Sequence, residues 1–412
     1  MKARLPFVFI IITMMLNSIG IGLILPVMPN LIADLTGGSI SSAALWGGIL
    51  ATTYAVMQFF MGPTLGNLSD RYGRRPVLLV SMVAMGLDYI LLSLAGTIWW
   101  LFAGRVIAGI SGATFSTASA YVADISAPEK RAANFGLVGA AFGVGFIVGP
   151  AIGGFLGEIG PRAPFVAAAI VSLANATLGY FILPETLAPS KRRAFDWTRA
   201  NPLGALISIR KIPHLTSLII IYLLFTISHQ VYPAVWSYFT IEKFDFSPKM
   251  IGASLATFGF FMALVQGGLI RVIIPRLGEM RTAMWGMALN FVVFIIVAFL
   301  GEAWMLFALM PLMTIGAVAG PALQGIMSQL VEDDAQGELQ GIFASVTGIA
   351  LILSPITMTS FFKYFTSTEA PYYLPGAPFL ASSVLDILAI AMLFIVARRI
   401  FSKKTVTDVN AG

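Results

Sequence analysis

Asp88 and Arg105 are ionisable residues that stand inside long apolar runs of the sequence. A carboxyl group removed from water favours its neutral form, so Asp88 could take up and release a proton. Arg105 stays charged at physiological pH and cannot carry the proton, but it could pair with Asp88 and set when the proton leaves. A permanent salt bridge is the alternative. Both interpretations hold if Asp88 and Arg105 form a salt bridge while Asp88 is ionised and separate when Asp88 takes up a proton.

A second group of charges lies in the stretch 66–76, between two apolar segments. Its arginines predict a loop on the cytoplasmic side of a membrane. Asp124 and Arg131 are expected on the same side, where they could join a charge network that holds this side closed. Exposed ion pairs that contribute little are the alternative. The candidate gating residues are Gly66, Ser69, Asp70, Arg71, Gly73, Arg74, Arg75, Asp124 and Arg131.

The elements that must position these residues are membrane-spanning helices. The chain has 412 residues, of which 58% are hydrophobic and only 11% charged, which predicts an all-α membrane protein. The expected spans are 6–32, 44–66, 75–96, 98–120, 132–157, 163–183, 214–240, 248–273, 281–300, 303–328, 338–362 and 377–400. They form two pseudo-symmetric six-helix bundles, 1–183 and 214–401, with a cytoplasmic linker 184–213 and a cytoplasmic tail 402–412.

Composition and charge exclude several classes of function. The chain has no cysteine and two histidines, so thiol catalysis, disulfides and histidine-rich metal sites are excluded. No paired carboxylates or metal-ligand cluster appears, which argues against an enzyme and predicts no metal site. Most of the 25 lysines and arginines fall in the loops expected on the cytoplasmic side, together with both termini. The net charge of +6 is therefore a topology signal and not a nucleic-acid-binding surface.

Small residues are concentrated in the fifth expected span. Their density permits close approach of helices in lipid, and Pro150 predicts a kink. Generic tight packing accounts for the glycines one by one, but the whole arrangement is more specific. It involves Gly145, Gly149, Pro150, Gly153 and Gly154.

These motifs resemble those of the major facilitator superfamily. The stretch 66–75 is similar to the superfamily loop G-x-L-x-D-R-x-G-R-R, and the fifth span resembles a signature of its antiporters that is associated with export. Similarity to the tetracycline/proton antiporters of the twelve-span drug-efflux group extends over nearly the whole chain. It rests on 17–29, 87–89, 104–105, 109–114, 321–328 and 337–341. The resemblance implies transport roles at Ser69, Asp70, Arg74, Asp88, Arg105, Asp124 and Arg131.

Spans 1, 4, 7 and 10 usually line the substrate cavity in this superfamily. The resemblance therefore implies an apolar, aromatic cavity with few hydrogen-bonding groups, which suits an amphipathic substrate. For each residue taken alone, the alternative to lining the cavity is an interhelical hydrogen bond that holds two helices together. The candidate cavity residues are Asn17, Gln58, His229, Gln230, Tyr232, Trp236, Asn290 and Gln324.

Three positions depart from the family pattern. Asn17 and Asn290 stand where the family typically has aspartates, and Met262 lies about where it has a histidine. An asparagine keeps hydrogen bonding but cannot titrate. Asp88 is therefore expected to be the main buried carboxylate, with His229 as a second protonatable group.

The resulting hypothesis is a secondary transporter of the bacterial inner membrane, working as a monomer without a cofactor. It would export a small amphipathic substrate, alone or as a metal chelate, in exchange for protons driven by the proton gradient. An uptake carrier for a metabolite or siderophore-like compound, on the same fold, is the alternative. A membrane sensor or scaffold is a third reading, which the lack of a soluble output domain disfavours.

Overall fold

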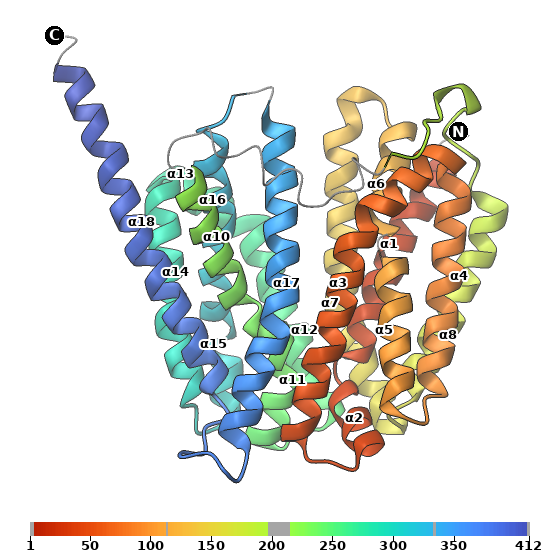
Figure 1. Cartoon of the computed structure of the whole chain (residues 1–412), viewed down its shortest axis with the longest axis horizontal. Helices are drawn as coiled ribbons and strands as arrows, with labels where there is room; N and C mark the ends of the chain where they lie inside the picture. Colours follow the sequence, from red (N-terminus) through yellow and green to blue (C-terminus); the bar gives the residue numbers. More distant parts are fainter. Residues whose placement is uncertain (1–3, 113, 197–214, 333–334, 410–412) are drawn as a thin grey trace. The chain divides into compact units, whose positions relative to one another are not determined.

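The computed structural model describes residues 4–112, 114–196, 215–332 and 335–409. Within these residues the regular elements are all helical (Figure 1). Twelve helical segments are long and apolar enough to cross a membrane. The predicted all-α membrane architecture of twelve spans is confirmed.

Among the described residues, the first six spans contain seven α-helices, and the short helix α2 lies between the first and second spans. These helices are α1 (Arg4–Ile24), α2 (Met28–Thr36), α3 (Ile40–Tyr72), α4 (Arg74–Ser93), α5 (Ile98–Gly112), α6 (Thr114–Ile125), α7 (Arg131–Ile159) and α8 (Ala163–Ile182). The second six begin with α10 (Leu215–His229), α11 (Val231–Phe244), α12 (Pro248–Leu264), a π-helical turn Val265–Leu269 and α13 (Ile270–Leu277). They continue with α14 (Glu279–Ala298), α15 (Ala303–Ile315), α16 (Ala319–Ser328), α17 (Gln336–Thr366) and α18 (Ala377–Val409).

Internal contacts divide the chain into two compact units. Unit 1 comprises Met1–Pro202 with Ser237–Gly259, and unit 2 comprises Leu203–Trp236 with Phe260–Gly412. The segment Ser237–Gly259 joins unit 1 through contacts such as the hydrogen bond from Ser237 Oγ to the Leu25 carbonyl, at 3.0 Å. The seventh and eighth spans are therefore each split between the two units. The sequence instead places the boundary between the sixth and seventh spans.

The first expected span is too long at its carboxyl end. Helix α1 ends at Ile24, and α2 starts separately at Met28. Pro26 has no backbone N–H to donate, and Pro29 is accommodated in the first turn of α2. The correction is physical: the apolar run continues from α1 into α2, but Pro26 and Pro29 stand close together here and the chain turns between the two helices.

The charged stretch between the second and third spans is mostly helical and not an open loop. α3 continues to Tyr72, and α4 begins at Arg74. Gly73 alone separates them, with φ 105° and ψ 157°, a conformation that favours glycine. Gly278 repeats this joint between α13 and α14, with φ 76° and ψ 158°. The stretches 70–75 and 275–281, one in each half of the chain, thus share a backbone geometry.

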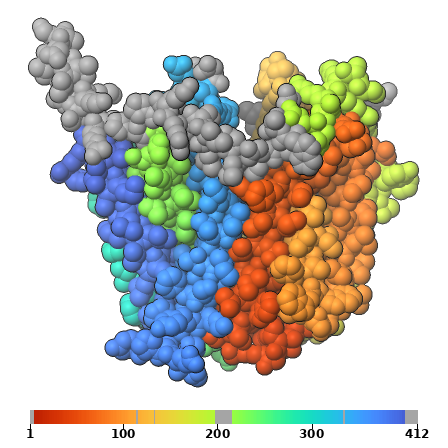
Figure 2. All heavy atoms as spheres, viewed as in Figure 1, coloured from red at the N-terminus to blue at the C-terminus, as the bar shows by residue number. Residues whose placement is uncertain are grey.

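Each unit has its own apolar interior. In unit 1, buried side chains of α1, α4, α6, α7 and α8 form one cluster, and in unit 2 a larger one draws on α10, α14, α16, α17 and α18. Large apolar side chains such as Trp99, Phe181 and Trp285 are exposed, as expected for helices that face lipid. Figure 2 shows the outer atoms of α3 and α5 side by side on one face of unit 1.

Candidate functional site

Asp88 and Arg105 meet inside unit 1. The Asp88 side chain on α4 is fully buried, and its Oδ2 lies 3.3 Å from Arg105 Nη2 on α5. Within the described residues, neither Asp88 Oδ1 nor Arg105 Nε has a hydrogen-bond partner. The pair is therefore held by one contact and keeps unused hydrogen-bonding capacity on both sides, which is costly in an apolar interior.

A glycine makes room for this pair. A Cβ atom added at Gly104 would lie 2.7 Å from Asp88 Oδ1 and 2.8 Å from Leu92 Cδ2. On α3, Tyr54 lies within electrostatic range of both Asp88 and Arg105. Gln58 Nε2 lies 3.2 Å from the Tyr54 hydroxyl and 3.4 Å from the Gly112 carbonyl. The structure therefore ties Gln58 to the surroundings of the Asp88–Arg105 pair.

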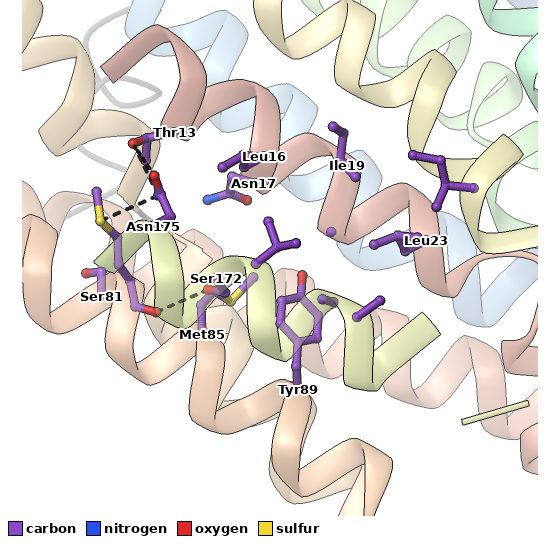
Figure 3. A pocket seen from close by; sticks show the side chains of 16 residues that line it. Thr13, Leu16, Asn17, Ile19, Leu23, Ser81, Met85, Tyr89, Ser172 and Asn175 are labelled. Atoms are coloured by element: carbon purple, nitrogen blue, oxygen red, sulfur yellow. Dashed lines mark hydrogen bonds between the residues drawn. The ribbon is translucent and has the colours of Figure 1, made fainter. Parts of the chain in front are cut away.

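Asn17 lines a cavity of about 190 Å³ inside unit 1 (Figure 3). The walls come from α1, α4 and α8, with one residue of α7, and are mostly apolar. Thr13 and Asn175 hydrogen-bond across it, and Tyr89, next to Asp88 in the chain, closes one side. The cavity is large enough for several water molecules or a small apolar group. This is where the structure places the asparagine that stands in for the family's first-span aspartate.

Arg74 is the centre of the charge cluster at the joint of α3 and α4. Its Nη1 lies 2.5 Å from Asp70 Oδ1 and 2.6 Å from Ser69 Oγ, and its Nε lies 3.4 Å from Asp124 Oδ2. Asp124 belongs to α6. All these contacts join elements of the same unit.

Glu185, just after α8, caps the first turn of α4. Its carboxylate accepts hydrogen bonds from the backbone N–H groups of Arg74 at 2.9 Å and Arg75 at 3.3 Å. A carboxylate is well suited to a helix N-terminus, where N–H groups lack intrahelical partners. A Cβ at Gly73 would overlap this carboxylate. Sequence reasoning missed Glu185, which it placed at the start of the linker.

The remaining candidate gating residues are placed differently. Arg75 Nη2 donates to the Tyr180 carbonyl at 2.7 Å, and Arg71 contacts the Tyr72 ring. Arg131 is exposed and makes no ion pair within the described residues. A Cβ at Gly66 would have room, since the nearest atom is 3.9 Å away. The expected network thus includes Ser69, Asp70, Arg74 and Asp124, without Arg71 or Arg131.

The glycines of α7 allow direct backbone contact on two sides. A Cβ at Gly149 would lie 2.7 Å from the Ile19 carbonyl oxygen, and one at Gly145 or Gly153 would overlap the α1 backbone. On another face, a Cβ at Gly154 would lie 2.5 Å from the Pro248 carbonyl oxygen. Pro150 also takes part, because its Cδ lies 2.6 Å from the place of a Cβ at Gly22.

In unit 2 the seventh span is interrupted for one residue at the expected aromatic cluster. α10 ends at His229, Gln230 lies in a turn, and α11 starts at Val231. The His229 ring stacks on Phe225 and meets the Tyr232 ring edge-on, with centroids 5.7 Å and 5.3 Å apart. Tyr232 and Trp236 are only 4% and 2% exposed, so the structure makes them part of the packed interior of the unit.

Two further candidates lie on other spans of unit 2. Asn290 is fully buried, and its side-chain amide has no hydrogen-bond partner within the described residues. Gly316 lies against that amide, where a Cβ would overlap it. Gln324 Nε2 donates to the Tyr222 hydroxyl at 2.8 Å. Asn290 is thus a buried polar group between helices, and Gln324 is a half-buried one.

Asp386 corrects the expectation that Asp88 is the main buried carboxylate. It lies near the middle of the membrane span Ala377–Arg398 of α18, is fully buried, and has Oδ1 at 2.5 Å from Ser228 Oγ on α10. The sequence carried a direct signal, since an acid inside an apolar run of span length is a functional candidate by default.

His214 falls outside the described residues, so the structure says nothing of it.

No three side chains of the metal-ligating types His, Cys, Asp and Glu come together in the part of the chain that the structure describes. The buried polar groups include two carboxyls, one facing a guanidinium and one facing a hydroxyl.

Twelve spans with buried acids inside two helical units define a polytopic membrane transport protein. The model of the Major Facilitator Superfamily matches residues 10–355, so the chain belongs to that superfamily. It is 39% identical to the class C tetracycline resistance protein of Escherichia coli, over 89% of this chain and 92% of the relative. It is 34% identical to the class H tetracycline resistance protein of Pasteurella multocida, over 95% of both.

A solved structure shares the fold at much lower identity. The nucleoside transporter NupG superimposes with a TM-score of 0.79 and 13% identity, over 95% of this chain and 99% of that one. At this identity the likeness concerns the fold alone.

Proposed function

We propose that the chain is a proton-coupled antiporter that exports an amphipathic, tetracycline-like small molecule across the bacterial inner membrane. The observation that carries this proposal is the Asp88–Arg105 pair, buried and joined by a single 3.3 Å contact. Support for the substrate class comes from the tetracycline resistance proteins, which match most of the chain. Because Asn17 and Asn290 leave fewer acids, we expect the accepted substrates to differ from those of these relatives.

In the proposed cycle Asp88 carries the proton. The free Oδ1 atom is the place for it, because no described residue hydrogen-bonds to it. A protonated Asp88 is neutral and no longer attracts Arg105, so the guanidinium is left to find another acceptor. The change in charge weakens the contact between α4 and α5 at this point. This is the local event that would bias the alternating-access equilibrium.

The charge cluster at Arg74 is proposed to lie on the cytoplasmic side, in accordance with the positive-inside rule. It ties the ends of α3, α4 and α6 together within unit 1. We propose that it keeps this end of the unit rigid during the cycle, and that gating depends on that rigidity. A metal ion bound to a chelated substrate would be cargo. The transporter works as a monomer in this proposal.

The test is proton-driven transport in everted membrane vesicles, with tetracycline as the probe. Asp88→Asn keeps the shape of the side chain but cannot titrate, so proton-driven accumulation should be lost while substrate-for-substrate exchange continues. Asp34→Asn, which changes an exposed carboxylate of α2, is the matched control and should transport normally. Undiminished accumulation by Asp88→Asn would place the proton carrier elsewhere. Faster accumulation in intact cells producing the protein than in cells without it would favour uptake.

A further inference from the structure

Asp386 is a buried acid that the proposed role of Asp88 leaves unused. It lies in α18, twelve residues before the end of the span Ala377–Arg398, and its side chain is fully buried. Its contacts differ from those of Asp88 in one essential respect. Asp88 faces a guanidinium, whereas the described residues give Asp386 no ion pair at all.

The contacts of Ser228 allow two arrangements of the proton between Ser228 and Asp386. Ser228 Oγ lies 2.5 Å from Asp386 Oδ1 and 3.1 Å from the Phe225 carbonyl oxygen. A serine hydroxyl has a single hydrogen to donate, and a carbonyl oxygen can only accept. If Ser228 donates to the Phe225 carbonyl, Asp386 must carry a proton and donate it to Ser228 Oγ. Both short contacts are then hydrogen bonds.

The ionised alternative is costly in this place. An ionised Asp386 would have one hydroxyl donor, no cation, and an Oδ2 atom without a partner in the described structure. Burying an unpaired carboxylate in an apolar medium is far more expensive than burying the neutral acid. We infer that Asp386 and Ser228 form a second proton-binding site, separate from Asp88, whose proton is loaded and released during transport.

The location of Ser228 shows how release could occur. Ser228 is in the last turn of α10, directly before the break at Gln230. Ser354 of α17 donates to the neighbouring Ile227 carbonyl at 3.2 Å and so satisfies a backbone group beside the break. The interruption is a single residue: the Gln230 N–H still donates to the Thr226 carbonyl and the Ala234 N–H to the Gln230 carbonyl, but Pro233 has no N–H to donate, which weakens the helix at this point. A movement at Gln230 would separate Ser228 from Asp386 and would change the affinity of Asp386 for its proton.

Other titratable groups must be considered around this site. α18 packs against α10, α14 and α17. Their titratable or charged side chains, with those at the start of α11, are Tyr222, His229, Tyr232, Glu279, Arg281, Glu338, Lys363 and Tyr364. Of these, Tyr232 lies within electrostatic range of Asp386, and a tyrosine supplies no positive charge near neutral pH. The charged residues of α14 and α17 belong to the first or last turns of their helices.

The first measurement is infrared spectroscopy of the purified full-length protein in lipid nanodiscs, followed through the carboxylic C=O stretch. The wild type should show such a band at neutral pH, and Asp386→Asn should lose it. Ser228→Ala should shift the band, since the acid loses its hydrogen-bond acceptor. Ser383→Ala is the matched control: this α18 hydroxyl donates to the Leu380 carbonyl and should leave the band unchanged. A wild-type minus Asp386→Asn difference spectrum that contains no carboxylic C=O band would overturn the proposal, whereas a band from a protonated Asp88 cancels in that difference.

The second measurement is the number of protons moved per substrate in proteoliposomes. This part rests on the proposed proton-coupled transport, whereas the infrared band does not. Asp386→Asn should lower the ratio while substrate still crosses the membrane. An unchanged ratio would overturn the exchange of this proton. Asp88→Asn should keep the infrared band of Asp386, so failure of the Asp88 mechanism and failure of the Asp386 site give different results.

Discussion

The Asp88 carboxylate meets the Arg105 guanidinium at 3.3 Å, with side chains that are 0% and 10% exposed. Breaking a buried ion pair from one side leaves a charge without compensation, at a cost of about 3–5 kcal/mol. Removing both charges avoids that cost. The pair therefore allows a double-mutant test of how tightly its members are coupled.

We predict that Asp88→Asn and Arg105→Gln are each less stable than the double variant that carries both changes. In Asp88→Asn the Arg105 charge stays buried without its partner, and in Arg105→Gln the same holds for Asp88. Thermal unfolding of the purified proteins in one detergent measures the difference. Additive losses in the double variant would mean that the two side chains do not interact energetically.

We predict that Gly104→Ala impairs transport and lowers stability by about 1–3 kcal/mol, as overpacking does. The added methyl would lie 2.7 Å from Asp88 Oδ1 and would force the carboxylate away from its position. Gly139→Ala, on α7, is the control because nothing lies within 4 Å of its new Cβ. Proton-driven tetracycline transport and thermal unfolding are the measurements. Normal transport by Gly104→Ala would show that the position of the Asp88 carboxylate is not critical.

We predict that Gly149→Ala separates α7 from α1 and destabilises unit 1. Its new Cβ would lie 2.7 Å from the Ile19 carbonyl oxygen and 3.0 Å from the Gly22 Cα, both backbone atoms that cannot turn aside. Gly143→Ala, on the same helix but with open space around the new Cβ, should be neutral or slightly stabilising. The melting temperatures of the two variants are compared directly, and equal values would contradict the backbone contact.

We predict that Glu185→Ala speeds hydrogen exchange in the first turn of α4. The Arg74 and Arg75 amides would lose their acceptor, and loss of such a cap costs about 1–2 kcal/mol. Glu185→Gln should have a smaller effect, because it keeps an acceptor oxygen. Exchange measured by mass spectrometry localises the change, and Glu129→Ala, at an exposed site, is the control. If the faster hydrogen exchange of Glu185→Ala were confined to the loop after α8, Glu185 would not be a cap of α4.

The sequence predicts the twelve spans because membrane helices are encoded locally, as apolar runs of sufficient length. Asp88 and Arg105 could be paired because they lie on consecutive spans, 17 residues apart. The partners of Asp386 and Glu185 lie 158 and 111 residues away. Such contacts depend on how the helices pack, which a single sequence does not specify. Arg131 has the expected charge, but it is exposed and forms no ion pair with this cluster within the described residues.

The joints at Gly73 and Gly278 contain a single residue each. Because a joint of one residue cannot extend, a tilt of one helix is transmitted to the next. We therefore expect α3 to move together with α4, and α13 together with α14. The two joints are not equally free. Gly73 is braced by the Glu185 carboxylate, whereas nothing lies within 4 Å of the Cβ position of Gly278. A side chain at position 73 would therefore meet both an unfavourable φ and the Glu185 carboxylate, whereas one at position 278 would meet the unfavourable φ alone.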